Sequence, residues 1–219
     1  MKPDDLMDLH IHTTFSDGYS TPTSVIEAAI AKNLKKISIT DHYSTSKPAL
    51  GSIDELEDYY HVITALKRKF SPQIQISVGI EVDMLSIDSL DLLKSFSWDL
   101  ILFEYVFTAS NWEEMFKKVI KFKQSHKSDC YIGLAHTRFR RVTHSKFEQV
   151  MNSIRENEII IELNTRYKNY LDPWFNYLDD QNWYSIGSDA HSLDRVGDVS
   201  EALSFLYNRN IPVNRIIQI

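Results

Sequence analysis

The sequence predicts an α/β fold built on a parallel sheet, either a barrel or a doubly wound sheet. Apolar runs of four to six residues recur along the 219 residues and alternate with amphipathic stretches. The run 159–163, Ile-Ile-Ile-Glu-Leu, is apolar almost throughout, as is typical of parallel strands whose sheet is covered on its outer face. Seven such runs give about 31 residues per unit, the size of a minimal strand–helix–strand repeat.

The apolar runs place seven strands in chain order. They are expected at Leu6–Thr13, Lys36–Thr40, Gln75–Glu81, Leu100–Phe103, Tyr131–Ala135, Ile159–Leu163 and Trp183–Ser188. Helix starts are expected where proline stands at a first helical position or where residues have capping-box spacing. These signals are Thr21-Pro22, Asp172-Pro173, Ser145 with Glu148, and Asp198 with Glu201.

The chain is expected to form a single domain over residues 1–219. No linker rich in glycine, serine or proline divides it, and it has only six glycines in total. The longest expected loop is Tyr43–Ser52, which directly follows a strand end. Active-site loops of α/β folds belong at this position.

Composition excludes some classes of protein. No stretch approaches the roughly 18 consecutive apolar residues that span a bilayer, so we expect no membrane protein. A net charge of −6 gives no broad attraction to extended nucleic acid, although a local cationic spot or a bound metal could still receive a small anion. The first residues lack a secretory pattern and Cys130 is the lone cysteine, so a cytoplasmic location is expected.

The first candidate site residues lie on the first expected strand. In the run Asp8-Leu9-His10-Ile11-His12-Thr13, alternate side chains point the same way, so His10 and His12 share one face. A lone histidine is more often structural than a ligand. Two at strand spacing, flanked by carboxylates, favour a metal site.

Further polar residues stand at the ends of the next two strands, in Thr40-Asp41-His42 and Gly79-Ile80-Glu81. A carboxylate that closes an apolar strand is costly to bury without a partner. For Glu81, a metal cation and a salt bridge to a lysine or arginine of the barrel are equally good partners.

The fifth and seventh strands end in the same way, with His136 in Gly133-Leu134-Ala135-His136 and with Asp189 and His191 in Gly187-Ser188-Asp189-Ala190-His191. All strands of a parallel barrel end on one face. We therefore expect seven side chains from distant parts of the chain to be neighbours: His10, His12, His42, Glu81, His136, Asp189 and His191.

The other three histidines, His61, His126 and His144, lie away from strand ends and are expected to be structural. The clustered set combines imidazole with carboxylate and has no group of thiolates, which suits Zn, Mn or Fe. Seven or more ligands are too many for one tetrahedral ion, so two or three divalent ions are expected, held in part by a bridging carboxylate.

These motifs together resemble those of the PHP (polymerase and histidinol phosphatase) family. The resemblance runs from about Met7 to Leu206 and rests on six ordered motifs: His10-Ile11-His12-Thr13 with Ser16-Asp17-Gly18, Thr40-Asp41-His42, Gly79-Ile80-Glu81, Ala135-His136, Glu162-Leu163-Asn164-Thr165 and Ser188-Asp189-Ala190-His191. It implies a distorted (β/α)7 TIM-like barrel, a trinuclear metal site and hydrolysis of phosphoesters.

The resemblance also implies how the ligands divide among the ions. One ion would be held by His10, His12, Glu81 and Asp189, a second by Glu81 and His136, and a third by Asp17, His42 and His191.

One departure from the family pattern concerns the fourth strand. The family usually places a further histidine just after it, as a ligand of the second ion, whereas this chain has Glu104. Glu104 could substitute as an oxygen ligand and favour a harder ion such as Mn or Fe, or the second site could be weak or empty. A pairing of Glu104 with a nearby arginine is equally plausible from the sequence.

Arginine is the expected group for anion recognition, because its planar guanidinium pairs bidentately with phosphate. The candidates all follow strand ends, and those nearest the motifs lead: Arg138, Arg166 and Arg195, ahead of Arg140 and Arg141.

The leading hypothesis is a metal-dependent phosphoesterase in which metal-activated water attacks phosphorus and Asp17 or His191 protonates the leaving oxygen. The expected partner is a small phosphorylated substrate, such as histidinol phosphate or a nucleotide. Two alternatives remain open on the same barrel: a non-catalytic metal-binding regulatory module, and a metal-dependent C–N hydrolase that would not need the arginines.

Overall fold

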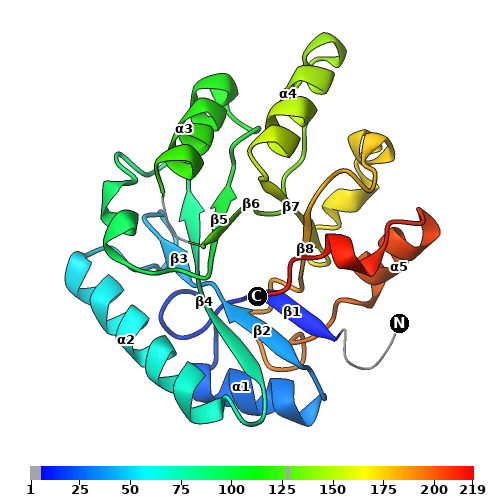
Figure 1. The fold of residues 1–219 in the computed structure, drawn as a ribbon. Coiled ribbons are helices and arrows are strands. Elements are labelled where there is room, and N and C mark those ends of the chain that lie inside the picture. The colour runs from blue at the N-terminus through cyan, green and yellow to red at the C-terminus, as the bar shows by residue number, and fades with distance from the viewer. Residues whose placement is uncertain (1–5, 127–128) are drawn as a thin grey trace.

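In the computed structural model, which describes residues 6–126 and 129–219, parallel strands form a nearly closed barrel with helices outside it (Figure 1). The sheet runs in the order β1-β2-β4-β5-β6-β7-β8 and all of its ladders are parallel. The strands are β1 (Met7–Ile11), β2 (Lys36–Ile39), β4 (Gln75–Asp83), β5 (Leu100–Glu104), β6 (Tyr131–Leu134), β7 (Ile160–Asn164) and β8 (Tyr184–Gly187). The distorted seven-stranded barrel is confirmed, and the seven expected strands match these within two residues at each end.

The barrel is distorted where β1 meets β8. The register of β1 shifts between Asp8 and Ile11, and only an isolated bridge joins Ile11 to Ala190. Two backbone hydrogen bonds close the seam: the Asp189 amide donates to the His10 carbonyl at 2.9 Å, and the His12 amide donates to the Ala190 carbonyl at 2.9 Å. The seam therefore brings the first and last motifs of the chain together.

A further short strand, β3 (His42–Tyr43), lies where the sequence predicts the end of a strand followed by a loop that starts at Tyr43. It pairs with β4 so that His42 lies opposite Glu81. The loop that follows is fixed at both ends, because the Leu50 amide donates to the His42 carbonyl at 2.9 Å and the Ser44 amide donates to Leu50 at 3.1 Å. A two-residue strand has no apolar run from which the sequence could reveal it.

In the part of the chain that the structure describes, five α-helices and four short 3₁₀ helices lie between the strands or after the last one. They are α1 (Pro22–Ala31), α2 (Ile53–Phe70), α3 (Trp112–Ser125), α4 (His144–Glu156), α5 (Ser200–Asn208), η2 (Asp91–Ser95), η3 (Asn169–Leu171), η4 (Pro173–Tyr177) and η5 (Val213–Arg215). The two proline signals are confirmed, since Thr21 caps α1 and Asp172 caps η4, although the second helix is only a short 3₁₀ turn. None of the described helices is long and apolar enough to cross a membrane.

The two expected capping boxes are wrong. Ser145 lies inside α4, which begins one residue earlier, and α5 begins after Val199 rather than after Asp198. The capping box found is at the start of α2, where the Ser52 hydroxyl accepts from the Glu55 amide at 3.2 Å and the Glu55 carboxylate accepts from the Ser52 amide at 3.0 Å. Both bonds satisfy donors that a helix start leaves unpaired.

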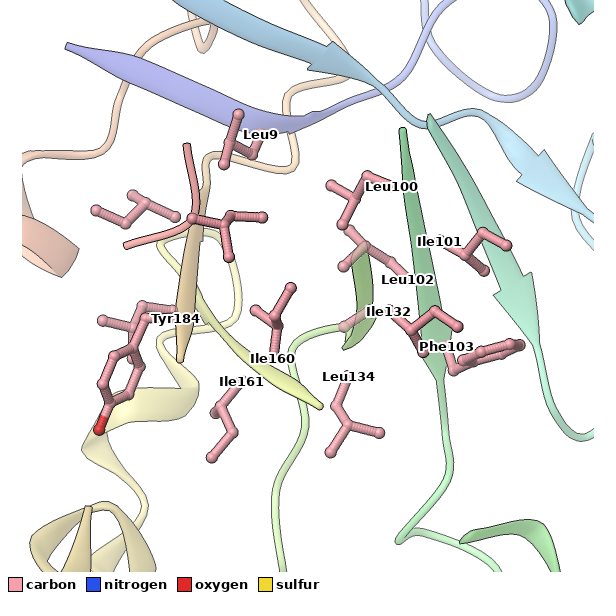
Figure 2. Close-up of a cluster of buried hydrophobic side chains, with 14 of the residues drawn as sticks. Leu9, Leu100, Ile101, Leu102, Phe103, Ile132, Leu134, Ile160, Ile161 and Tyr184 are labelled. Carbon is pink, nitrogen blue, oxygen red and sulfur yellow. The ribbon is translucent and has the colours of Figure 1, made fainter. Parts of the chain in front are cut away.

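On the side formed by β5, β6 and β7, the barrel is filled by aliphatic side chains. Figure 2 shows Leu100, Leu102 and Ile160 between these strands, and none of the three is more than 1% exposed. Gly133 allows this close packing, because a Cβ there would lie 3.0 Å from Leu102 Cδ2 and 3.3 Å from Ile160 Cβ. Side chains of opposite parity face outward: the ring of Phe103 packs edge-on against a phenylalanine of α3, with centroids 5.8 Å apart.

Candidate metal centre

The predicted ligands meet at the end of the barrel where the strands finish, which we call the mouth. His10 and His12 are both buried, and their Nε2 atoms lie 3.0 Å apart. The alternation of β1 therefore does place the two imidazoles on one face, as the sequence predicts.

Glu81, on β4, lies at the centre of these imidazoles. Its Oε2 is 3.3 Å from His10 Nε2, 3.4 Å from His12 Nε2 and 3.0 Å from His42 Nδ1, and its Oε1 is 3.0 Å from His136 Nε2. Burial favours the neutral acid, but His10 and His42 outweigh it and hold the pKa of Glu81 well below its usual range. No lysine or arginine is among these contacts, which leaves the metal interpretation of Glu81 as the better of the two.

Asp17 comes from the loop after β1 and closes the side of the cluster next to His191. Its Oδ1 is 3.0 Å from His191 Nε2 and its Oδ2 is 3.7 Å from His42 Nε2. Burial raises the pKa of this carboxyl, but the nearby His191 and the charge of His12 outweigh that effect and lower the pKa to about 2. Gly18 lets the loop fold back on β1, because a Cβ there would lie 2.5 Å from the His12 carbonyl carbon.

Asp189 links the end of β8 to β1. Its Oδ1 is 3.4 Å from both His12 Nε2 and His191 Nδ1. Its backbone is left-handed, with φ of 52°, and Tyr105 and His136 at the same mouth have φ of 63° and 30°. Non-glycine residues pay for this conformation, and such strain is often concentrated at functional sites.

Three groups of described residues place their ligand atoms close enough to share an ion. They are His12, Asp17, His42 and His191; His10, His12 and Asp189; and His42, Glu81 and Glu104. Ligand atoms in these groups include buried ones without a hydrogen-bond partner: Asp17 Oδ1, His42 Nδ1, Glu81 Oε2 and Glu104 Oε1. Buried polar atoms are rarely left unpaired, so this donor set fits divalent cations.

Glu104, the last residue of β5, faces this cluster. Its Oε1 is 3.5 Å from His42 Nδ1 and its Oε2 is 3.6 Å from His136 Nε2. Burial and the charge of Glu81 raise the pKa of Glu104 to about 8. The cation beside it is a lysine rather than the arginine considered from the sequence: Lys47 Nζ lies 3.5 Å from Glu104 Oε2.

Arg166 is the predicted arginine that reaches the cluster. Its Nη1 lies 3.1 Å from Asp189 Oδ1 and 2.6 Å from His191 Nδ1. The Arg166 side chain is 44% exposed, so part of it remains open to solvent next to the buried ligands.

The other two leading arginines are engaged elsewhere. Arg138 donates to the Tyr167 carbonyl at 2.5 Å, at the edge of the mouth. Arg195 pairs with Asp198 at 2.6 Å. The anion-binding role of all three arginines stays a prediction.

Two residues at the site were not singled out as site residues from the sequence. Glu162, on β7, lies 2.7 Å from His10 Nδ1 through Oε1, and its Oε2 accepts from the His136 amide at 2.5 Å. Lys47 also lies 3.2 Å from His42 Nε2. The signal for Glu162 was its charge within an apolar strand, whereas a loop lysine such as Lys47 carries no comparable signal.

The three histidines expected to be structural lie outside the cluster. His61 and His144 are exposed, and His126 stacks on Phe122 with ring centroids 5.0 Å apart.

Next to His136 is a hollow of about 210 Å³ whose lining includes Tyr105, Tyr167, Arg138 and Arg140. The ring of Tyr167 is 4.4 Å from that of His136, so this hollow opens beside the cluster.

Parts of the chain are similar to curated proteins. It is 36% identical over 85 residues to the DNA polymerase/3'-5' exonuclease PolX of Bacillus subtilis (strain 168), covering 38% of this chain and 15% of that protein. It is 31% identical over 77 residues to the histidinol-phosphatase of Lactococcus lactis subsp. lactis (strain IL1403), covering 35% of this chain and 29% of that protein. The matches therefore span less than a third of either relative.

Among solved structures, the histidinol phosphate phosphatase of Lactococcus lactis subsp. lactis Il1403, in complex with Zn, L-histidinol and phosphate, has a TM-score of 0.64. The superposition covers 95% of both chains at 18% identity, so it shows a shared fold. The family model of the PHP domain matches residues 8–208, which is most of the chain. The chain therefore belongs to the PHP domain family.

Proposed function

We propose that this protein is a metal-dependent phosphoesterase that hydrolyses a small phosphomonoester. The observation that carries the proposal is the convergence of five histidines and several carboxylates at one mouth, where buried ligand atoms lack hydrogen-bond partners. Family membership and the zinc and phosphate bound by the Lactococcus lactis structure support it.

The proposed ligands divide into three sets, two of which share Glu81. One ion would be held by His10, His12, Glu81 and Asp189, and another by Asp17, His42 and His191; the remaining set is Glu81, His136 and Glu104. When bound, such cations lower the pKa of a water molecule and neutralise charge on phosphoryl oxygens.

Glu162 is the residue that would orient His10. Its carboxylate lies 2.7 Å from His10 Nδ1, so it accepts a hydrogen bond from Nδ1–H and leaves the Nε2 lone pair facing the cluster. Metal-binding histidines commonly depend on such a partner for their tautomer and basicity. The same carboxylate fixes the backbone of His136, so one residue of β7 positions ligands from β1 and β6.

Arg166 would bind the phosphoryl group of the substrate, and the pair formed by Asp17 and His191 would protonate its leaving oxygen. The half-exposed guanidinium of Arg166 is placed to pair with a phosphoryl oxygen at the mouth. Asp17 or His191, whose Oδ1 and Nε2 lie 3.0 Å apart, would supply the proton for the leaving oxygen.

The leaving group would lie in the hollow beside His136. Its volume of about 210 Å³ suits a small alcohol, and its two tyrosine rings and two arginines suit a planar or acidic one. Histidinol, which the Lactococcus lactis structure binds, and a nucleoside are therefore the leaving groups to compare.

The test is release of inorganic phosphate from a panel that contains histidinol phosphate, nucleoside monophosphates and sugar phosphates, with Mn²⁺, Zn²⁺, Fe²⁺ or Mg²⁺ supplied. We expect turnover with at least one of the first three ions and loss of turnover in Glu81→Gln. Lys168→Met, on the exposed pair with Glu201, is the matched control. Inactivity of the native chain with every metal and ester would contradict the proposal, and turnover of amides alone would favour a C–N hydrolase.

A further inference from the structure

The ligand set of Glu81, His136 and Glu104 has a lysine beside it, which also lies next to His42 of a neighbouring set. Glu104 stands where the family resemblance leads us to expect a histidine, and the ammonium of Lys47 lies 3.5 Å from its Oε2. Lys47 is 31% exposed, so most of its side chain lies within the mouth.

The position of Lys47 is fixed by its surroundings. Two residues before Lys47, the Thr45 hydroxyl donates to the Asp83 carboxylate at 2.9 Å. This bond holds the loop against the end of β4. The ammonium lies 5.7 Å from the centroid of the Tyr105 ring and 3.2 Å from His42 Nε2. A cation held by a carboxylate, an imidazole and an aromatic ring is placed by the fold rather than by chance contact.

The contacts of Glu104 divide between its two oxygens. Oε1 faces His42 and has no hydrogen-bond partner, whereas Oε2 lies 3.5 Å from Lys47 Nζ and 3.6 Å from His136 Nε2. Among the described residues, none of the three groups that could share an ion contains His136. Glu81 and Glu104 form such a group with His42 instead, so the ligand atoms close around His42 and not around His136, where Lys47 Nζ lies beside Glu104 Oε2.

We propose that the ammonium of Lys47 takes the place of a divalent cation at the set of Glu81, His136 and Glu104, supplying positive charge to Glu104, so that the protein holds two ions rather than three. This inference rests on the proposed metal-dependent function. A divalent cation on Glu104 Oε2 would face the Lys47 charge at close range in a poorly solvated site, where like charges repel strongly. The glutamate in place of the family's histidine is accounted for in the same way, because a carboxylate carries a negative charge that balances an ammonium, whereas a neutral imidazole carries none.

The test is the number of ions bound, measured by elemental analysis after loading with Mn²⁺ and removal of free metal. We expect about two ions per chain in the native protein and about three in Lys47→Met, whose unbranched side chain has a similar length. Lys47→Arg keeps the charge and should stay at about two, and Lys168→Met on the exposed surface should not differ from the native protein.

Three ions in the native chain, or equal numbers in the native chain and a folded Lys47→Met, would overturn this inference and leave the proposed function intact. Absence of any bound ion would overturn both. Anomalous scattering from a Mn²⁺-loaded crystal of the native protein decides the matter if Lys47→Met does not fold. We expect two peaks and Lys47 Nζ next to Glu104, whereas a third peak between Glu104 and His136 would contradict the inference.

Discussion

The two ends of the barrel are built on opposite principles. On β5, Leu100 and Leu102 fill the interior with aliphatic side chains, and two residues later the same face of the strand ends in Glu104. On β7, Ile160 is followed on the same face by Glu162. A single strand thus passes from a region that stabilises the fold by burial to one that buries charge.

This contrast indicates that stability and chemistry are separable in this fold. Apolar burial contributes about 25 cal/mol per Å², whereas buried charges without full compensation cost free energy. The unpaired atoms at the mouth include Glu81 Oε2 and Glu104 Oε1, and the left-handed backbone at Asp189 adds strain. The mouth is therefore maintained by the rest of the barrel, and its unpaired ligand atoms fit divalent cations.

The sharpest test of this separation is Glu81→Gln, which keeps the shape of the central ligand and removes its charge. We expect hydrolysis to fall about 10²- to 10³-fold and bound metal to decrease, because charge stabilisation at the reacting centre is lost. Far-ultraviolet circular dichroism should remain that of the native protein. Full activity in the variant would mean that the carboxylate at the centre of the mouth has no part in the reaction.

At the opposite end, Leu100→Ala should reverse the pattern. Leu100 is fully buried, so the substitution leaves a cavity and should lower the free energy of unfolding by about 2–5 kcal/mol. Denaturant unfolding measures this loss, and activity per folded molecule should stay within a few-fold of native. A large loss of turnover without loss of stability would show that the two ends are coupled.

Glu162→Gln sharpens the comparison at the boundary between the two regions. The amide is a weaker acceptor for His10 Nδ1, so we expect metal affinity to fall about 10- to 100-fold, as for other partners of metal-binding histidines. Titration of the metal-stripped protein with Zn²⁺ measures the change, with Glu201→Gln on the surface as the control. Equal affinities of the native chain and Glu162→Gln would show that Glu162 does not influence metal binding.

The smallest expected effect is on the reactivity of Cys130, which lies next to β6 at the end of the barrel opposite the mouth. It lines a cleft of about 560 Å³ together with Tyr131 and Trp183, yet burial raises the pKa of its thiol to about 12. The native protein should therefore react slowly with a thiol reagent at pH 8 and fully after denaturation, because the thiolate is the reactive form. Rapid reaction of the native chain would show that this end opens readily.

The sequence predicted the strands well because each is an apolar run with a turn at its end, and it predicted the meeting of His10 with Asp189 because parallel strands finish on one face. It missed β3, whose two residues carry no periodic signal. It also placed two helix starts wrongly, because Ser145 and Asp198 match a spacing that occurs by chance within helices and loops.

Within the site, the residues that the sequence could not place are those whose position depends on tertiary contacts. From the sequence, the partner of Glu104 could be a metal ion or an arginine. The structure places Lys47 beside it instead, from a loop that Thr45 holds to Asp83. Arg195 follows a motif as closely as Arg166 does, yet it turns to Asp198. Proximity in sequence to a motif does not determine the direction of a long flexible side chain.

The most direct test of the central claim, that the mouth is completed by divalent cations, is the melting temperature of chelator-treated protein during titration with Mn²⁺ or Zn²⁺. Ligands that bind the folded state stabilise it by about 2.7 kcal/mol at a hundred times their dissociation constant. We predict a clear, saturable rise for the native chain and a much smaller one for Glu81→Gln. A native melting temperature that stays constant with every added cation would contradict the account.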